Sequence, residues 1–304
     1  MEEIFFHNLH QVGRTRAILE YRRPRNRKLL TSEHNQPLIN RLVRTINRAY
    51  FGRYISKRFI GRVALLLEGL AQEGNALAAY WLATINWEGW GVPTNPEKAL
   101  ELFHLAAEHG NRVAQYNLGV AYDNGLGITK NQATAFGYFF ESAKQGETEA
   151  MHSVGSMYYW GHGVVQNYSR ASYWYRKSAK RGFATAMCDL GRCYQRGVGV
   201  KKDLQKAINW FTKAVKAGDV RAKTWLGLAY TCLPDPKWKL ARYWLEQASE
   251  QEQVHAMYLL GAWAESGWNG NENLADAQFW YSHAAELGHT RAALCLAELK
   301  GENF

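Results

Sequence analysis

The chain has 304 residues, a net charge of +10 and 47% hydrophobic residues, with 12 Trp and 17 Tyr among its aromatics. This amount of apolar side chain is enough for an ordered core and excludes a wholly disordered chain. Purely apolar runs such as residues 63–67 are far too short to cross a bilayer, and no apolar leader follows the opening Met-Glu-Glu. We therefore expect a cytoplasmic protein without a transmembrane segment.

The positive charge is concentrated near the N-terminus. Residues 1–70 carry 14 Lys and Arg against five acids, and the rest of the chain is nearly neutral. Such a basic head is typical of contacts with nucleic acid, an anionic membrane surface or an acidic partner, although a solvated arginine-rich face is the alternative. No DNA- or RNA-reading motif accompanies the charge. The basic patch comprises Arg22, Arg23, Arg25, Arg27, Lys28, Arg41, Arg44 and Arg48.

An internal repeat begins after this head. The residue that ends each repeat, here called its mark, recurs every 36 residues. One step is 34 residues long and ends on Glu instead of Gly. These marks are Gly74, Gly110, Gly146, Gly182, Gly218, Glu252 and Gly288. A glycine at the end of a helical pattern suits the left-handed residue that closes a helix. A period of this length indicates stacked helix pairs.

Two helices are predicted in each unit. Eight residues before each mark stands a large residue that we expect to anchor the second helix, and three residues before it stands a small one. The large residues are Leu66, Leu102, Tyr138, Trp174, Trp210, Trp244 and Trp280. Eight residues after each mark comes Leu or Val, usually followed by Gly, as in Leu190-Gly191. A Gly repeated inside a helix costs about 1 kcal/mol relative to Ala, so it indicates that a Cβ there would meet the partner helix.

Glycine pairs such as Gly161/Gly163 and Gly197/Gly199 recur with the same period. A dinucleotide-binding loop follows a strand and occurs once per βαβ unit, so four periodic copies instead indicate the turn between paired helices. The fifth turn, residues 232–237, lacks the pair and accounts for the shorter step.

These residues resemble the Sel1-like repeat family, a relative of the tetratricopeptide repeats. The fourth unit carries the pattern best, with Leu190, Gly191, Gly197, Gly199 and Trp210 in their places. The resemblance implies an all-α fold, a right-handed α-solenoid. We expect a basic arm at 1–37, a degenerate capping repeat at 38–73, six repeats at 74–289 and a capping helix at 290–304. An amphipathic helix that binds a membrane surface or a partner is the alternative for 38–73.

The resemblance also implies that the first helix of each pair lines a concave binding surface. Tyr and Trp are favoured anchors of binding, although rings at helical spacing also serve as core. The partner-binding candidates on that surface are Tyr80, Thr84, Trp87, Glu88, Tyr116, Asp123, Asn124, His152, Ser156, Tyr159, Trp160, Arg192, Gln195 and Arg196.

No catalytic or metal-binding pattern is present in the sequence. The four Cys have no C-x-x-C spacing, and the ten His form no His-Glu-x-x-His motif. We therefore expect no enzyme, no cofactor and no metal, but a bacterial scaffold, adaptor or regulator that binds a protein or peptide. Signalling, secretion and toxin antagonism are the roles that the resemblance offers. The alternative is a nucleic-acid or anionic-surface contact through the basic head.

Overall fold

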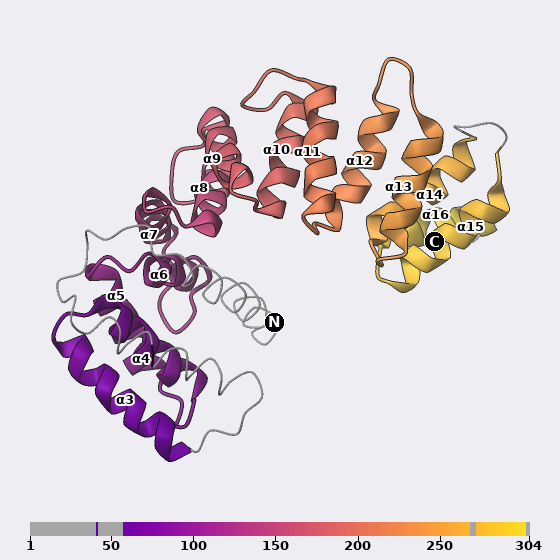
Figure 1. The fold of residues 1–304 in the computed structure, drawn as a ribbon. Coiled ribbons are helices and arrows are strands. Elements are labelled where there is room, and N and C mark those ends of the chain that lie inside the picture. The colour runs from indigo at the N-terminus through magenta and orange to yellow at the C-terminus, as the bar shows by residue number, and fades with distance from the viewer. Residues whose placement is uncertain (1–40, 42–56, 268–271, 302–304) are drawn as a thin grey trace. The chain divides into compact units, whose positions relative to one another are not determined.

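The computed structural model describes residues 41, 57–267 and 272–301. Over these ranges the regular secondary structure is all helical, which confirms the all-α prediction (Figure 1). The helices are α3 (Lys57–Gln72), α4 (Ala76–Glu88), α5 (Pro96–Glu108), α6 (Arg112–Asn124), α7 (Gln132–Lys144), α8 (Thr148–Trp160), α9 (Tyr168–Lys180), α10 (Ala184–Arg196), α11 (Leu204–Lys216), α12 (Arg221–Thr231), α13 (Trp238–Ser249), α14 (Val254–Ser266), α15 (Leu274–Glu286) and α16 (Thr290–Lys300).

The chain divides into two compact units between Asn131 and Gln132. In the first unit α3 packs on α4, α4 on α5 and α5 on α6. In the second unit each helix from α7 to α16 packs on the next, and α10 also contacts α12. We call the first helix of each repeat the A helix (α4, α6, α8, α10, α12 and α14) and the second the B helix. Neighbour-on-neighbour packing of this kind is what a solenoid requires.

The repeat-end marks close their helices in the left-handed region, as the sequence predicted. The mark glycines have φ between 82° at Gly110 and 96° at Gly146. Glu252, which occupies the mark of the shortened unit, has a φ of 54° and is the one non-glycine residue with positive φ among those described. The position therefore imposes its backbone conformation even on a residue with a Cβ, at some cost in strain.

The glycines inside the A helices are imposed by packing. A Cβ on Gly155 would lie 2.7 Å from the Tyr175 ring, and one on Gly191 would lie 2.6 Å from the Phe211 ring. The same close approach recurs at Gly261, where the Tyr281 ring would be 2.6 Å away. The expectation that a Cβ would clash with the partner helix is confirmed.

In each unit the residue after the predicted anchor of the B helix is buried, and of the predicted anchors Trp174 is buried as well. Leu66 is 51% exposed, whereas the residue after it, Leu67, is fully buried. Phe211 and Leu245, which likewise follow the expected anchors, are also fully buried. The buried ring pairs with a small residue three positions later, as Phe211 does with Ala214, because residues at i and i+3 share a helix face.

Only the second helix of the predicted capping repeat falls within the described residues. Val63, Leu67 and Ala71 of α3 are buried, and α3 packs on α4. The first part of that repeat lies outside the described residues, apart from Arg41, which is exposed. No helix in the described part of the chain is long and apolar enough to span a membrane.

Candidate functional site

The predicted site residues of the first unit are mostly engaged inside it. Tyr80 is 9% exposed, and its ring centroid lies 5.4 Å from that of Trp81 and 6.0 Å from that of Phe103. Thr84 donates its hydroxyl to the Tyr80 carbonyl oxygen at 3.0 Å. Trp87 is half-buried and also packs on Phe103, at 6.4 Å. Tyr80 therefore serves as core and offers a partner little area.

The other candidates of the first unit are half-buried or exposed. Glu88, Tyr116 and Asp123 are half-buried, and Asn124 is exposed. The Asn124 amide donates to the carbonyl oxygen of Val120 in its own helix, at 2.9 Å.

In the second unit the candidates on α8 share one face. His152, Ser156, Tyr159 and Trp160 are spaced at i, i+4, i+7 and i+8, which places them along a single stripe of a helix. His152 packs between rings, with its centroid 5.4 Å from Tyr175. The Ser156 hydroxyl and the Tyr175 hydroxyl lie 3.2 Å apart in a hydrogen bond.

A charged network joins α8 to α10. His152 Nε2 lies 2.8 Å from Asp189 Oδ2, and Arg192 donates to Asp189 Oδ1 at 3.2 Å. Burial of Asp189 acts to raise the pKa of its carboxyl, but the hydrogen bond and charge of His152, together with Arg221 and Arg192, outweigh it and hold that pKa below its usual value. The Asp189 carboxylate therefore fixes two of the predicted site residues across neighbouring repeats.

The network continues from α10 to α12 through Trp225. The Arg192 guanidinium lies 4.7 Å and the Arg196 guanidinium 5.9 Å from the centroid of this ring. Two buried polar atoms on α10, Arg192 Nε and Gln195 Oε1, have no hydrogen-bond partner. Buried polar atoms normally have hydrogen-bond partners, so this donor and this acceptor are exceptions on the face of α10.

An exposed aromatic cluster lies at the C-terminal end of the stripe on α8. Trp160 is 60% exposed, and its ring centroid lies 4.9 Å from Tyr159 in an edge-on contact. Tyr159 in turn contacts Tyr168, the first residue of α9, at 5.3 Å. We call Tyr159, Trp160 and Tyr168 the aromatic cluster. Its rings are held by one another while much of their surface faces solvent.

Sequence reasoning missed three residues of this site. Asp189 and Trp225 occupy the position just before the repeated Leu, which was not counted as part of the binding face. Their side chains join neighbouring A helices, an effect that depends on stacking rather than on position in one helix. Tyr168 lies at the start of a B helix, where no repeated pattern points to it.

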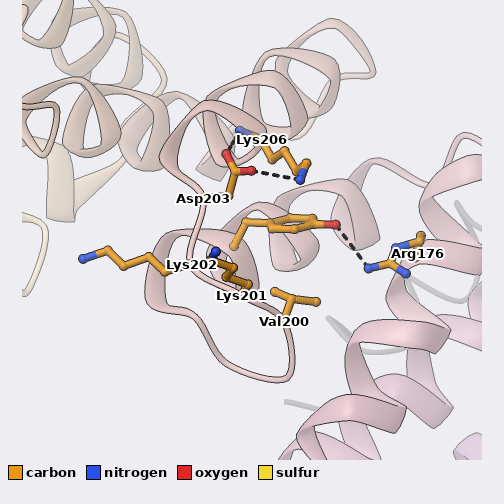
Figure 2. A pocket seen from close by; sticks show the side chains of 7 residues that line it. Arg176, Val200, Lys201, Lys202, Asp203 and Lys206 are labelled. Carbon is orange, nitrogen blue, oxygen red and sulfur yellow. Dashed lines mark hydrogen bonds and ion pairs between the residues drawn. The ribbon is translucent and has the colours of Figure 1, made fainter.

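Elsewhere in the second unit, a pocket of about 450 Å³ lies where α9, α10 and the start of α11 meet (Figure 2). Figure 2 shows Asp203 bonded to Lys206, with Arg176 reaching the pocket from α9. The hydrogen bond to Asp203 is the main cause that raises the pKa of Lys206. The pocket is lined by Arg176, Tyr194, Val200, Lys201, Lys202, Asp203 and Lys206. Sequence reasoning did not single out this group.

The two thiols of α10 are buried, which disfavours the reactive thiolate form. Cys188 and Cys193 are buried, and burial is the main cause that raises the pKa of Cys193 to about 12. Among the residues that the structure describes, no group of three or more His, Cys, Asp or Glu is placed to hold a metal ion. Apart from Arg41, the predicted basic patch from Arg22 to Arg48 lies outside the described residues.

A model of the Sel1 repeat matches residues 76–111, 112–147, 148–183, 184–219, 239–252 and 254–289. The unmatched stretch between the fourth and fifth of these matches, residues 220–238, contains the turn without a glycine pair. No curated protein sequence matches the chain.

Solved structures with similar folds include the following two. A protective antigen present in uropathogenic Escherichia coli strains, which displays an SLR fold, is 28% identical with a TM-score of 0.69 over 78% of this chain. The match spans about half of that antigen, 51% of its length. A Sel1 repeat protein from Oxalobacter formigenes is 30% identical with a TM-score of 0.59, over 70% of this chain and 89% of the other. The chain belongs to the Sel1 repeat family.

Proposed function

We propose that this protein is a non-catalytic adaptor or regulator that binds a protein or peptide partner along the A-helix face of its second unit. Sel1 repeat proteins generally mediate protein–protein interactions. The observation that carries the proposal for this chain is the aromatic cluster, in which Trp160 is 60% exposed at the end of the stripe on α8. Signalling, secretion or toxin antagonism would each use such a surface.

The aromatic cluster has the properties of a binding anchor. Its three rings are held by edge-on contacts, so these side chains lose little entropy when a partner covers them. Trp and Tyr at the centre of an interface are often worth about 2 kcal/mol or more when truncated to Ala. A partner that buries Trp160 would draw much of its affinity from this residue.

The charged network beside the aromatic cluster supports the same face. Arg192 and His152 are held by the Asp189 carboxylate before any partner arrives. The unsatisfied Arg192 Nε and Gln195 Oε1 are a donor and an acceptor on one helix, one turn apart. A peptide backbone carries both complementary groups.

The test compares proteins captured by the wild-type chain with those captured by the double variant Trp160→Ala/Tyr168→Ala. The matched control is Tyr243→Ala on α13, which removes a ring that is 50% exposed outside the A-helix face. We expect a partner that is captured by the wild type and by the control but lost with the double variant. Circular dichroism melting checks that all three proteins are folded. Equal capture of every partner by the double variant would refute the proposal.

A further inference from the structure

The pocket between α9, α10 and α11 carries an excess of positive charge that its own residues do not neutralise. Four basic residues and one acid line it. Asp203 is fully engaged, because it accepts the backbone N–H of Lys206 at 2.9 Å and pairs with the Lys206 ammonium at 2.9 Å. This one acid therefore leaves the other three cations of the pocket without neutralisation.

The other three cations have no acidic partner among the residues that the structure describes. The Arg176 guanidinium donates to the Tyr194 hydroxyl at 3.1 Å, a neutral acceptor that leaves its other N–H groups available. Lys201 and Lys202 form no ion pair with any described residue. Three uncompensated cations around a hollow of about 450 Å³ form a receptor for negative charge.

The neighbouring repeats act as internal comparisons, and they do not reproduce this arrangement. One period earlier, the positions of Arg176, Lys201 and Lys202 hold Phe140, Val165 and Gln166. Two periods earlier they hold His104, Thr129 and Lys130. Because each repeat keeps the same helices and turn, these three cations are not required by the fold.

We propose that this pocket binds an acidic segment of a protein, with Asp or Glu carboxylates seated on Arg176, Lys201 and Lys202. Arg is suited to a carboxylate because its planar fork donates two parallel hydrogen bonds. The two lysines lie next to each other on the turn before α11, so they can take successive carboxylates of an extended segment.

The lining favours a peptide over nucleic acid. Single-stranded nucleic acid needs aromatic faces on which its bases can stack. The one aromatic ring of the pocket, Tyr194, has the Lys206 ammonium 5.7 Å from its centroid and its hydroxyl bonded to Arg176. The pocket therefore offers charge without a free stacking surface.

The test measures binding of a fluorescent hexaglutamate peptide to the full-length chain by anisotropy, with hexaglutamine as the uncharged control peptide. The pocket variant is Arg176→Gln/Lys201→Gln/Lys202→Gln. The matched control variant is Lys180→Gln/Lys216→Gln/Lys239→Gln, which removes three exposed charges of the same unit away from the pocket. Both variants keep the basic N-terminal region and have equal net charge.

We expect the pocket variant to bind hexaglutamate about tenfold more weakly, from the loss of three ion pairs, and the control variant to bind within about twofold of the wild type. Equal weakening in both variants would overturn the proposal, because general charge would explain it. If an oligonucleotide binds the wild type more tightly than hexaglutamate and loses that binding only in the pocket variant, the acidic-protein occupant is overturned. Should the triple variant fail to fold, Lys201→Gln/Lys202→Gln carries the test, because it removes no hydrogen bond that the structure shows.

Discussion

Replacement of Gly191 by Ala is expected to destabilise the second unit, although the same change in a solvated helix stabilises a protein. Gly191 lies inside α10, and a Cβ there would be 2.6 Å from Phe211 Cε1 and 2.7 Å from Phe211 Cδ1. An ordinary carbon–carbon contact is about 3.5–4.0 Å, so the methyl group would overlap the ring by about 1 Å. Phe211 is fully buried, and its ring has no solvent space to move into.

Two opposing effects decide the size of the change. Overpacking a buried site costs about 1–3 kcal/mol, and the rigid ring places this site at the upper end. Replacing a helix-interior Gly by Ala stabilises the folded state by about 1 kcal/mol, because Ala has the higher helix propensity. The net loss is therefore about 1–2 kcal/mol in the free energy of unfolding.

The matched control is Gly137→Ala in α7. Gly137 also lies inside a helix, but a Cβ there would meet nothing within 4 Å. Only the propensity effect remains, so this variant should be more stable than the wild type by about 0.5–1 kcal/mol. One substitution type thus has opposite signs at two positions of one unit.

Denaturant unfolding measures both changes. It is followed by circular dichroism and by Trp fluorescence, because repeat arrays can unfold in more than one step and coincident curves test for this. If Gly191→Ala proved as stable as the wild type or more stable, contact with Phe211 would not explain the glycines inside the A helices.

Three further predictions concern pH, an ion pair and the basic head. Burial and the neighbouring His289 lower the pKa of His255, so the folded state binds fewer protons than the unfolded state. Stability should therefore fall as pH drops from about 7 to about 5, and His255→Gln should flatten that fall in urea midpoints measured across this range. Asp219 is 8% exposed and accepts both the backbone N–H and the guanidinium of Arg221, so Asp219→Ala should lower the free energy of unfolding by about 1–2 kcal/mol. Arg221→Ala should also lower the free energy of unfolding in the same assay, because it leaves the Asp219 carboxylate, whose side chain is 4% exposed, without its counter-charge. If the basic head binds phosphates, deletion of residues 1–37 should weaken binding to duplex DNA or anionic vesicles, and full-length binding should weaken steeply between about 50 and 200 mM salt; insensitivity to salt would refute this role.

The repeat register could be predicted from the sequence because backbone conformation is a local property. A glycine every 36 residues marks where the chain must turn through positive φ, and the structure confirms this at Gly110 and Gly146. The glycines inside the A helices were equally informative, since a repeated residue of low helix propensity needs a packing cause. These local signals fix both helices of a unit and the turn between them.

The candidate site was predicted only in part. Position along one A helix indicated His152, Tyr159 and Trp160, which the structure places on one stripe of α8. The same rule also selected Tyr80, which packs against Phe103 as core. A helical pattern shows which residues share a face, but the bulk of the neighbouring helix decides how much of that face remains exposed.

The sequence by itself determined the family, the all-helical class, the 36-residue unit and the glycines that close and pack its helices. Tertiary structure alone decided which residue of the B helix is buried, which charges pair across repeats, and where Arg176 meets the turn that carries Lys201. The physical reason is how far apart in the sequence the interacting residues lie. Turns and helix faces follow from residues a few positions apart, whereas burial and electrostatics depend on side chains that stacking brings together from neighbouring repeats.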